Sequence, residues 1–235
     1  MSRGRWRQIL DVLTSVAVIA ASAAVVWVFV VHPALAPRKS GQAEPPVPKE
    51  PVSLDGAATK GNPAAKIALI VHSDFQCPFC GGFARETLRE LERRYVDSGK
   101  ILIVFRHLPL PIHRNASKAA EAAECAAKQA RFWEMHDRLF ASASDLDLTN
   151  LLAAADAVGL DGTRFRACLD QGEASARVRD DIAMAVKLQI TGAPAFLIGT
   201  ITADRRVSVV RRISGAAALS VFIDAIDAVI GQGRS

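Results

Sequence analysis

Cys77 and Cys80 are separated by only two residues, Pro78 and Phe79, and together they form a Cys-x-x-Cys pair. An apolar run precedes the pair and a helical pattern follows it, so we expect Cys77 at the start of a helix. Unpaired backbone N–H groups and the positive end of the helix dipole stabilise a thiolate at that place. Cys80 then lies one turn further on the same face, where it can displace a substrate bound to Cys77. This active-site loop predicts thiol–disulfide exchange, with Cys77 as the nucleophile and Cys80 as the resolving thiol.

Closely spaced cysteines also occur in zinc sites and in inert disulfides. A zinc site usually offers a second close pair or a Cys/His cluster, whereas Cys125 and Cys168 stand alone, 43 residues apart. A structural disulfide within Cys-x-x-Cys would close a ring too small to constrain much of the unfolded chain. We therefore predict no metal and no cofactor. The remaining candidate ligands are widely spaced and are expected to be surface or groove histidines: His107, His113 and His136.

The elements around the pair can be predicted from their hydrophobic patterns. Residues 66–71 (KIALIV) form a continuous apolar run, typical of a strand that is covered on both faces. Residues 81–95 carry apolar side chains at helical spacing, and residues 101–105 form a second apolar run. A strand, a helix and a strand with so short a return predict a βαβ unit with parallel strands.

The pattern is helical throughout residues 115–188, in stretches at 116–130, 132–140, 148–158, 162–169 and 174–188. Strand character returns at residues 195–198 and 206–213, which we expect to form a hairpin, and residues 216–230 read as an amphipathic helix. The predicted architecture is thus an α/β domain with a mixed sheet, made of residues 52–114 and 189–235. An all-helical domain, residues 115–188, interrupts it.

The N-terminal part of the chain has the features of a membrane anchor. Residues 12–31 contain no charge, and at ~1.5 Å per residue they would span ~30 Å as one transmembrane helix. Three arginines in residues 1–11 predict a cytoplasmic N-terminus for this signal-anchor and an extracytoplasmic or periplasmic C-terminal domain. The alternative is a cleaved signal peptide, because residues 34–36 (ALA) resemble a cleavage site. Residues 32–51 are rich in proline and charge and predict an extended tether.

The charge distribution argues against a nucleic-acid-binding protein. The formal net charge is +5, but residues 1–40 hold five basic residues and one acidic residue. The rest of the chain carries 24 basic and 23 acidic residues. This part of the chain is nearly neutral, so it has no excess of positive charge that would attract the phosphates of a nucleic acid.

Four stretches of this sequence resemble the DsbA-like thiol:disulfide oxidoreductases of the thioredoxin superfamily, in the order in which that family has them. The resemblance covers about 180 residues. It implies a thioredoxin fold with an inserted all-helical domain, and it implies that Pro194 follows a cis peptide bond and faces the cysteines. Ala193 and Pro194 would then present backbone to an extended substrate strand. The matching stretches are 73–80 (SDFQCPFC), 105–113 (FRHLPLPIH), 125–140 and 191–196 (TGAPAF).

Two further expectations concern residues outside the Cys-x-x-Cys pair. An even cysteine count in an exported protein invites pairing, and some members of the resembled family have a second disulfide in the helical domain. We therefore expect a structural disulfide between Cys125 and Cys168, with two separately buried thiols as the alternative. Many thioredoxin-like proteins carry a buried carboxylate six residues before the first cysteine. Val71 occupies that position, so the sequence does not identify the group that transfers a proton to the second thiol. Asp74 and His72 are nearby in the sequence.

The sequence predicts a membrane-anchored dithiol oxidase that donates its disulfide to reduced, unfolded exported proteins. Family resemblance implies a membrane reoxidant of the DsbB or vitamin K epoxide reductase type, and we expect a monomer. The alternatives are a thiol–disulfide reductase or isomerase, and a holdase or assembly factor without redox turnover.

Overall fold

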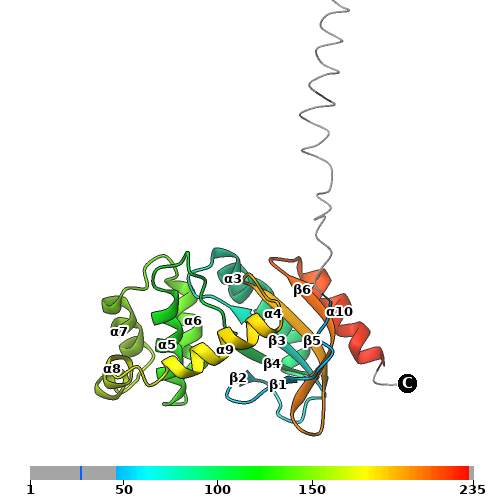
Figure 1. Ribbon diagram of the computed structural model, residues 1–235, viewed down its shortest axis with the longest axis horizontal. Coiled ribbons are helices and arrows are strands. Elements are labelled where there is room, and N and C mark those ends of the chain that lie inside the picture. The colour runs from blue at the N-terminus through cyan, green and yellow to red at the C-terminus, as the bar shows by residue number, and fades with distance from the viewer. Residues whose placement is uncertain (1–26, 28–45, 233–235) are drawn as a thin grey trace, which may run out of the picture. The chain divides into compact units, whose positions relative to one another are not determined.

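The computed structural model describes Trp27 and residues 46–232. The predicted cytoplasmic segment (residues 1–11), the predicted transmembrane helix (residues 12–31, Trp27 apart) and the first part of the predicted tether (residues 32–45) lie outside the described residues. Within those that are described, no helix is both long and apolar enough to cross a bilayer. The folded part of the chain contains a sheet, a group of helices beside it and a C-terminal helix on its other side (Figure 1).

The centre of the fold is a six-stranded sheet with the strand order β1-β6-β5-β3-β4-β2. β3 and β4 are parallel, and all other neighbouring strands are antiparallel, so the sheet is mixed as predicted. The predicted hairpin is formed by β5 and β6, while the short edge strands β1 and β2 were not predicted. The strands are β1 (Val52–Ser53), β2 (Ala58–Lys60), β3 (Ile67–Ser73), β4 (Ile101–His107), β5 (Ala195–Ile201) and β6 (Arg206–Ser214).

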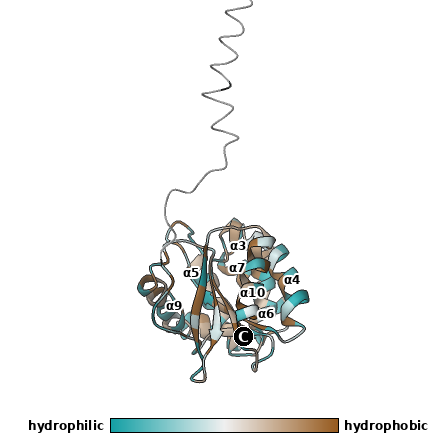
Figure 2. Ribbon diagram, turned by 90° about the vertical axis from the view of Figure 1, so that its right-hand side faces the viewer, coloured by the Kyte–Doolittle hydropathy of each residue, from teal (hydrophilic) through white to brown (hydrophobic). Residues whose placement is uncertain are grey.

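One continuous helical segment connects β3 to β4 and completes the βαβ unit. It begins at Pro78 with Cys77 as the N-cap residue, in agreement with the expected place of Cys77 at the start of a helix. Two stretches of it are π-helical. Its inner face is buried, while α4 carries hydrophilic residues on the outside (Figure 2). The segment consists of α3 (Pro78–Gly82), η2 (Phe83–Thr87), α4 (Leu88–Leu91) and η3 (Glu92–Val96).

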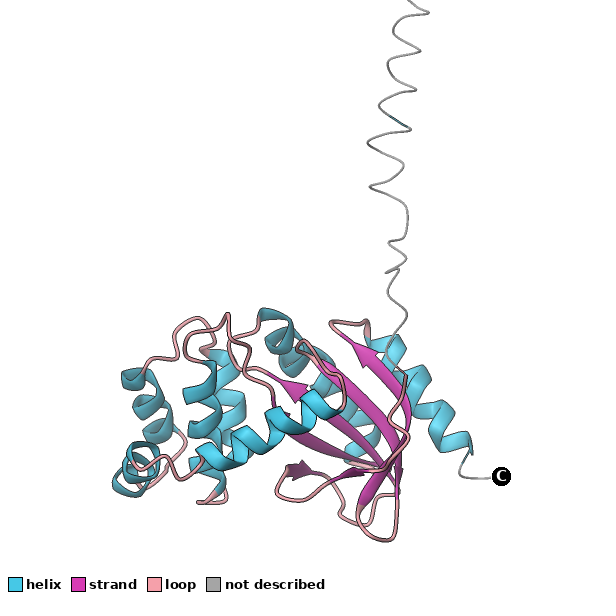
Figure 3. Ribbon diagram, viewed as in Figure 1, coloured by secondary structure: helices cyan, strands magenta, loops and turns pink. Residues whose placement is uncertain are grey.

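Five helices follow β4, where the sequence predicted an all-helical block. The first four lie beside the sheet, and α9 returns across it toward β5 (Figure 3). The C-terminal helix α10 (Leu219–Gln232) begins three residues later than predicted. The helices of the block are α5 (Ala116–Ala127), α6 (Phe132–Ala141), α7 (Leu148–Ala157), α8 (Gly162–Asp170) and α9 (Ser175–Lys187).

Three apolar cores hold these layers together. One core packs α4 and α10 against a face of the sheet, and a second packs α9 against residues from the opposite face. The third core fills the helical block and reaches the Cys-x-x-Cys pair, so that Cys77 and Cys80 share it with Cys125 and Cys168. The redox candidate therefore lies where the helical block packs onto the sheet.

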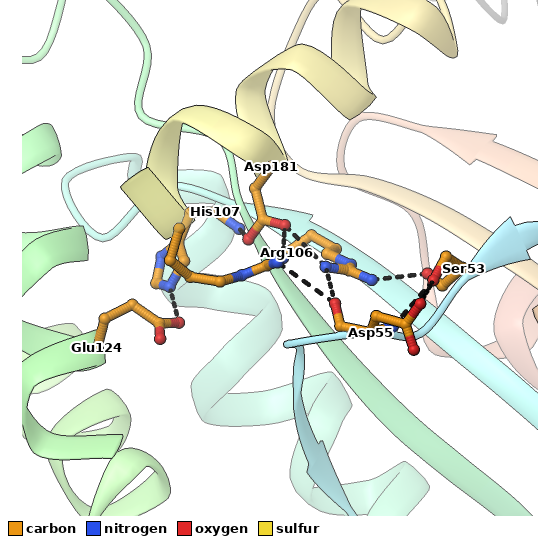
Figure 4. Close-up of polar contacts among 7 residues, drawn as sticks. Ser53, Asp55, Arg106, His107, Glu124 and Asp181 are labelled. Carbon is orange, nitrogen blue, oxygen red and sulfur yellow. Dashed lines mark hydrogen bonds and ion pairs between the residues drawn. The ribbon is translucent and has the colours of Figure 1, made fainter. Parts of the chain in front are cut away.

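A buried polar network fastens α9 to the sheet and to the segment before β2 (Figure 4). Arg106 on β4 donates to Asp181 on α9 at 2.9 Å, and both side chains are almost completely buried. Arg106 also donates to the carbonyl oxygens of Ser53 and Asp55, at 2.6 and 3.1 Å. The second carboxylate oxygen of Asp181 accepts from the backbone N–H of His107 at 2.9 Å. The network thus joins three segments that are far apart in the sequence.

Candidate active site

The two cysteines of the pair lie at the junction between β3 and the helix that follows it. Cys77 is the N-cap residue of α3 and Pro78 occupies the first helical position, where a missing N–H leaves no partner unsatisfied. The backbone N–H of Gly81 donates to the Cys77 carbonyl at 3.0 Å, which closes the first turn. Both cysteines are free thiols, so the described structure is the dithiol form. Cys77 is 3% exposed and Cys80 is completely buried.

The surroundings shift the pKa values of the two thiols in opposite directions. A hydrogen bond from the Cys80 side chain lowers the pKa of Cys77 to about 6, with further help from the backbone N–H groups of Cys80 and Phe79. Burial and the charge of Asp74 oppose this effect. The pKa of Cys80 is raised far above its ordinary value, first by the same hydrogen bond to Cys77 and then by burial. Cys77 is therefore the thiol that ionises near neutral pH.

The residues before β5 lie directly against the dithiol. The peptide bond between Ala193 and Pro194 is cis. The Cys77 thiol donates to the backbone carbonyl of Ala193 at 3.4 Å, across 116 residues of sequence. The backbone carbonyl of Ala193 thus places residues 193–194, which were predicted to bind substrate, beside Cys77.

Two large apolar side chains, in the active-site loop and in the loop after β4, are exposed. Phe79, in the active-site loop, is 64% exposed, and Ile112, in the loop after β4, is 82% exposed. Phe79 also lines a small cavity together with Phe83 and Phe196.

Cys80 has polar neighbours, although Val71, six residues before Cys77, is buried in an apolar core. The backbone N–H of Asp74 donates to the Cys80 sulfur at 3.5 Å. The Ser73 hydroxyl also hydrogen-bonds this sulfur and acts to lower its pKa. Ser73 was missed in the sequence because its place at the end of an apolar strand carries no chemical signal.

Within the described residues His72 does not hydrogen-bond the buried thiol, because neither of its ring nitrogens has a hydrogen-bond partner there. Its side chain is completely buried on β3. Burial first, and then the charges of Arg106 and Arg212, lower the pKa of His72 to about 3. The imidazole is therefore neutral at physiological pH and lies among cationic side chains.

Cys125 and Cys168 are joined by a disulfide that links α5 to α8. Their Cα atoms are 5.9 Å apart, within the usual range for such bonds. Both residues are buried in the core of the helical block. The bond therefore ties two helices of that block together beside the dithiol.

The three widely spaced histidines were expected at the surface or in a groove, but His107 and His136 are buried. Each of the three pairs with a carboxylate. His107 lies 2.8 Å from Glu124, His113 lies 2.7 Å from Asp74, and the distance from His136 to Asp137 is 2.9 Å. Among the residues that the structure describes, no group of three potential ligands lies close enough to hold a metal ion.

Comparison with known proteins identifies the family. A family model described as Thioredoxin matches residues 54–211. The solved structure of alpha-DsbA1 from Wolbachia pipientis is 26% identical, with a TM-score of 0.68 over 77% of this chain and 94% of that chain. The chain belongs to the DsbA-like thiol:disulfide oxidoreductases of the thioredoxin superfamily. A thioredoxin-like oxidoreductase from Silicibacter pomeroyi is 27% identical to this DsbA-like protein, with a TM-score of 0.59, covering 73% of this chain and 90% of that chain.

Curated relatives of the DsbA-like protein carry a different name. Na(+)/H(+) antiporter NhaA 3 of Salinispora tropica is 39% identical over 149 residues, which are 63% of this chain and 22% of the antiporter. NhaA 1 of Salinispora arenicola is 38% identical over the same length and the same shares of both chains. The DsbA-like protein therefore spans about a fifth of the length of these relatives. The names of these much longer proteins refer to Na(+)/H(+) antiport.

Proposed function

We propose that the protein is a membrane-anchored, extracytoplasmic dithiol oxidase that introduces disulfides into exported proteins through Cys77 and Cys80. One observation carries the proposal: the pKa of Cys77 is lowered to about 6 while that of Cys80 is raised. A stabilised Cys77 thiolate favours the reduced form of the enzyme. Whatever favours the reduced form makes the disulfide a stronger oxidant.

The proposed half-reaction starts from the oxidised enzyme, in which Cys77 and Cys80 share a disulfide. A substrate thiolate attacks the Cys77 sulfur, forms a mixed disulfide with it and displaces Cys80, which takes up a proton because its pKa is raised. A second substrate thiol loses its proton and attacks the substrate sulfur of the mixed disulfide. This step releases Cys77 as a thiolate. The substrate has lost two electrons, the enzyme has gained them, and the product is the dithiol form described here.

The backbone beside the dithiol supports a substrate that binds as an extended chain. The carbonyl of Ala193 already hydrogen-bonds the Cys77 thiol. A substrate strand that pairs with residues 193–194 would bring its own cysteine to the same sulfur. The exposed Phe79 and Ile112 would contact the apolar side chains that an unfolded protein presents.

Anchoring and partners are the second part of the proposal. The uncharged residues 12–31, preceded by three arginines, support a single-pass anchor in the bacterial inner membrane with the C-terminal domain outside the cytoplasm. Membrane tethering raises the effective concentration of the domain near a membrane reoxidant of the DsbB or vitamin K epoxide reductase type. Fractionation of cells and protease digestion of spheroplasts test this topology. Recovery in the soluble cytoplasmic fraction would refute it.

Equilibration of the full-length protein with glutathione tests the direction of electron flow. We expect a reduction potential closer to that of DsbA, about −120 mV, than to that of thioredoxin, about −270 mV. A value near that of thioredoxin would favour a reductase instead. The variant Cys77→Ser distinguishes an oxidase or a reductase from a holdase, because a holdase keeps its cellular activity when the nucleophile is removed.

A further inference from the structure

Asp74 is a buried carboxylate that lies between the dithiol and the loop after β4. Its side chain is completely buried. One oxygen accepts from the backbone N–H of Gln76 at 2.7 Å, within the active-site turn. The other accepts from the backbone N–H of Leu110 at 2.7 Å and lies 2.7 Å from Nδ1 of His113. The carboxylate thus fixes residues 108–113 to the turn that carries Cys77.

The backbone of Asp74 is hydrogen-bonded to both cysteines. Its N–H donates to the Cys80 sulfur at 3.5 Å, and its carbonyl accepts from the N–H of Cys77 at 3.2 Å. These bonds hold the residue next to the Cys80 sulfur and to the backbone of Cys77. The Asp74 charge raises the pKa of Cys77, against the hydrogen bonds that lower it.

We propose that Asp74 is a positioning residue that limits the oxidising strength of the dithiol, because its fixed negative charge opposes the negative charge on Cys77 in the reduced protein. A carboxylate near a thiolate disfavours the charged thiolate. In the oxidised protein Cys77 carries no charge and the repulsion vanishes. Asp74 therefore destabilises the reduced form relative to the disulfide and makes the disulfide less oxidising than its helix position alone would make it.

The hydrogen bonds to the Asp74 carboxylate also explain why its charge stays close to the dithiol. An exposed carboxylate would turn toward water and its effect would be screened. Here three groups hold the two oxygens inside the protein, and the loop that they hold carries the exposed Ile112. The inference deepens the proposed function and rests on it at one point, namely that Cys77 is the thiol that ionises.

The test compares Asp74→Asn and Asp74→Glu in the full-length protein. The measurements are the pH titration of the Cys77 thiolate and the equilibrium with glutathione. Asparagine removes the charge, and we expect the Cys77 midpoint to fall by about 0.5 to 1 pH unit and the glutathione equilibrium to shift at least twofold toward the reduced protein. Glutamate disturbs the packing but keeps the charge, so its midpoint stays near that of the wild type. Asp156→Asn, on the exposed side of α7, is the matched control and leaves both values unchanged.

Two results would overturn the proposal: a midpoint in Asp74→Asn that is unchanged or raised, or an equal fall in Asp74→Glu, which would point to packing instead of charge. If Asp74→Asn does not fold, His113→Phe decides. Loss of Nδ1 leaves the carboxylate less compensated, so the Cys77 midpoint must rise, and an unchanged or lower midpoint refutes the inference. A wild-type potential near that of thioredoxin would instead refute the oxidase proposal, so the two failures are distinguishable.

Discussion

Asp181→Asn removes a buried negative charge from the network of Figure 4 while keeping the size of the side chain. In the folded protein the two carboxylate oxygens accept from Arg106 and from the His107 N–H, each at 2.9 Å, and Arg177 also donates to the carboxylate. An asparagine side chain offers a single oxygen to these three donors. The buried charge of Arg106 also loses its only buried anionic partner in the described network.

The expected cost follows from this geometry. Removing one partner of a buried ion pair costs about 3–5 kcal/mol, because the remaining charge stays buried without compensation. Arg106 keeps its hydrogen bonds to the carbonyls of Ser53 and Asp55. We therefore expect the lower end of the range, a loss of about 3 kcal/mol in the free energy of unfolding.

Urea unfolding of the full-length protein in detergent, followed by circular dichroism, measures this loss. Asp170→Asn is the matched control, because Asp170 pairs with Arg166 at 2.8 Å while both side chains are half exposed. An exposed pair of this kind contributes about 0–1 kcal/mol. If Asp181→Asn lost no more stability than Asp170→Asn, the reasoning about buried charge in this network would be wrong.

Two further predictions concern stability. The pKa of His72 is about 3 in the folded protein and near 6.5 in the unfolded chain, so below pH 6.5 only the unfolded chain gains this proton, and the free energy of unfolding falls by about 1.4 kcal/mol per pH unit. In urea titrations between pH 6 and pH 4, His72→Leu should reduce this dependence of the free energy of unfolding on pH. Equal slopes for the variant and the wild type would contradict the prediction. Replacing both Cys125 and Cys168 by alanine opens a loop with a sequence separation of 43 residues. In the chain-entropy model this lowers the free energy of unfolding by about 2–4 kcal/mol. An unchanged urea midpoint for this double variant would show that the disulfide contributes nothing to stability.

The elements next to the dithiol could be predicted from the sequence because their signals are local. The apolar run before the Cys-x-x-Cys pair has the composition of a buried strand, and helical spacing begins directly after it. Cys77 therefore could be placed at a helix N-terminus from the sequence alone. The cis bond before Pro194 came from family resemblance, since nothing local in the sequence requires it.

The contacts that tune the site could not be predicted, because they join residues that only the tertiary fold brings together. Asp74 and Leu110 are 36 residues apart, and Arg106 and Asp181 are 75 residues apart. His72 follows an apolar run and reads as a strand end, yet it lies buried among charged side chains.

Short and irregular elements are a second limit of sequence patterns. β1 and β2 span two and three residues, which is too few to show the alternation of a strand. The π-helical stretches η2 and η3 lie within a segment whose apolar spacing looks like that of an ordinary α-helix. Neither feature leaves a pattern in the residue types.

The pH titration of Cys77 in the reduced protein tests the central claim most directly. Thiolate absorbance in the ultraviolet, with Cys77→Ser as the blank, gives the midpoint for this sulfur alone. We predict a midpoint of about 6, because the neighbouring thiol and the helix N–H groups stabilise the anion. A midpoint near 8.5, the value of an ordinary free cysteine, would contradict it.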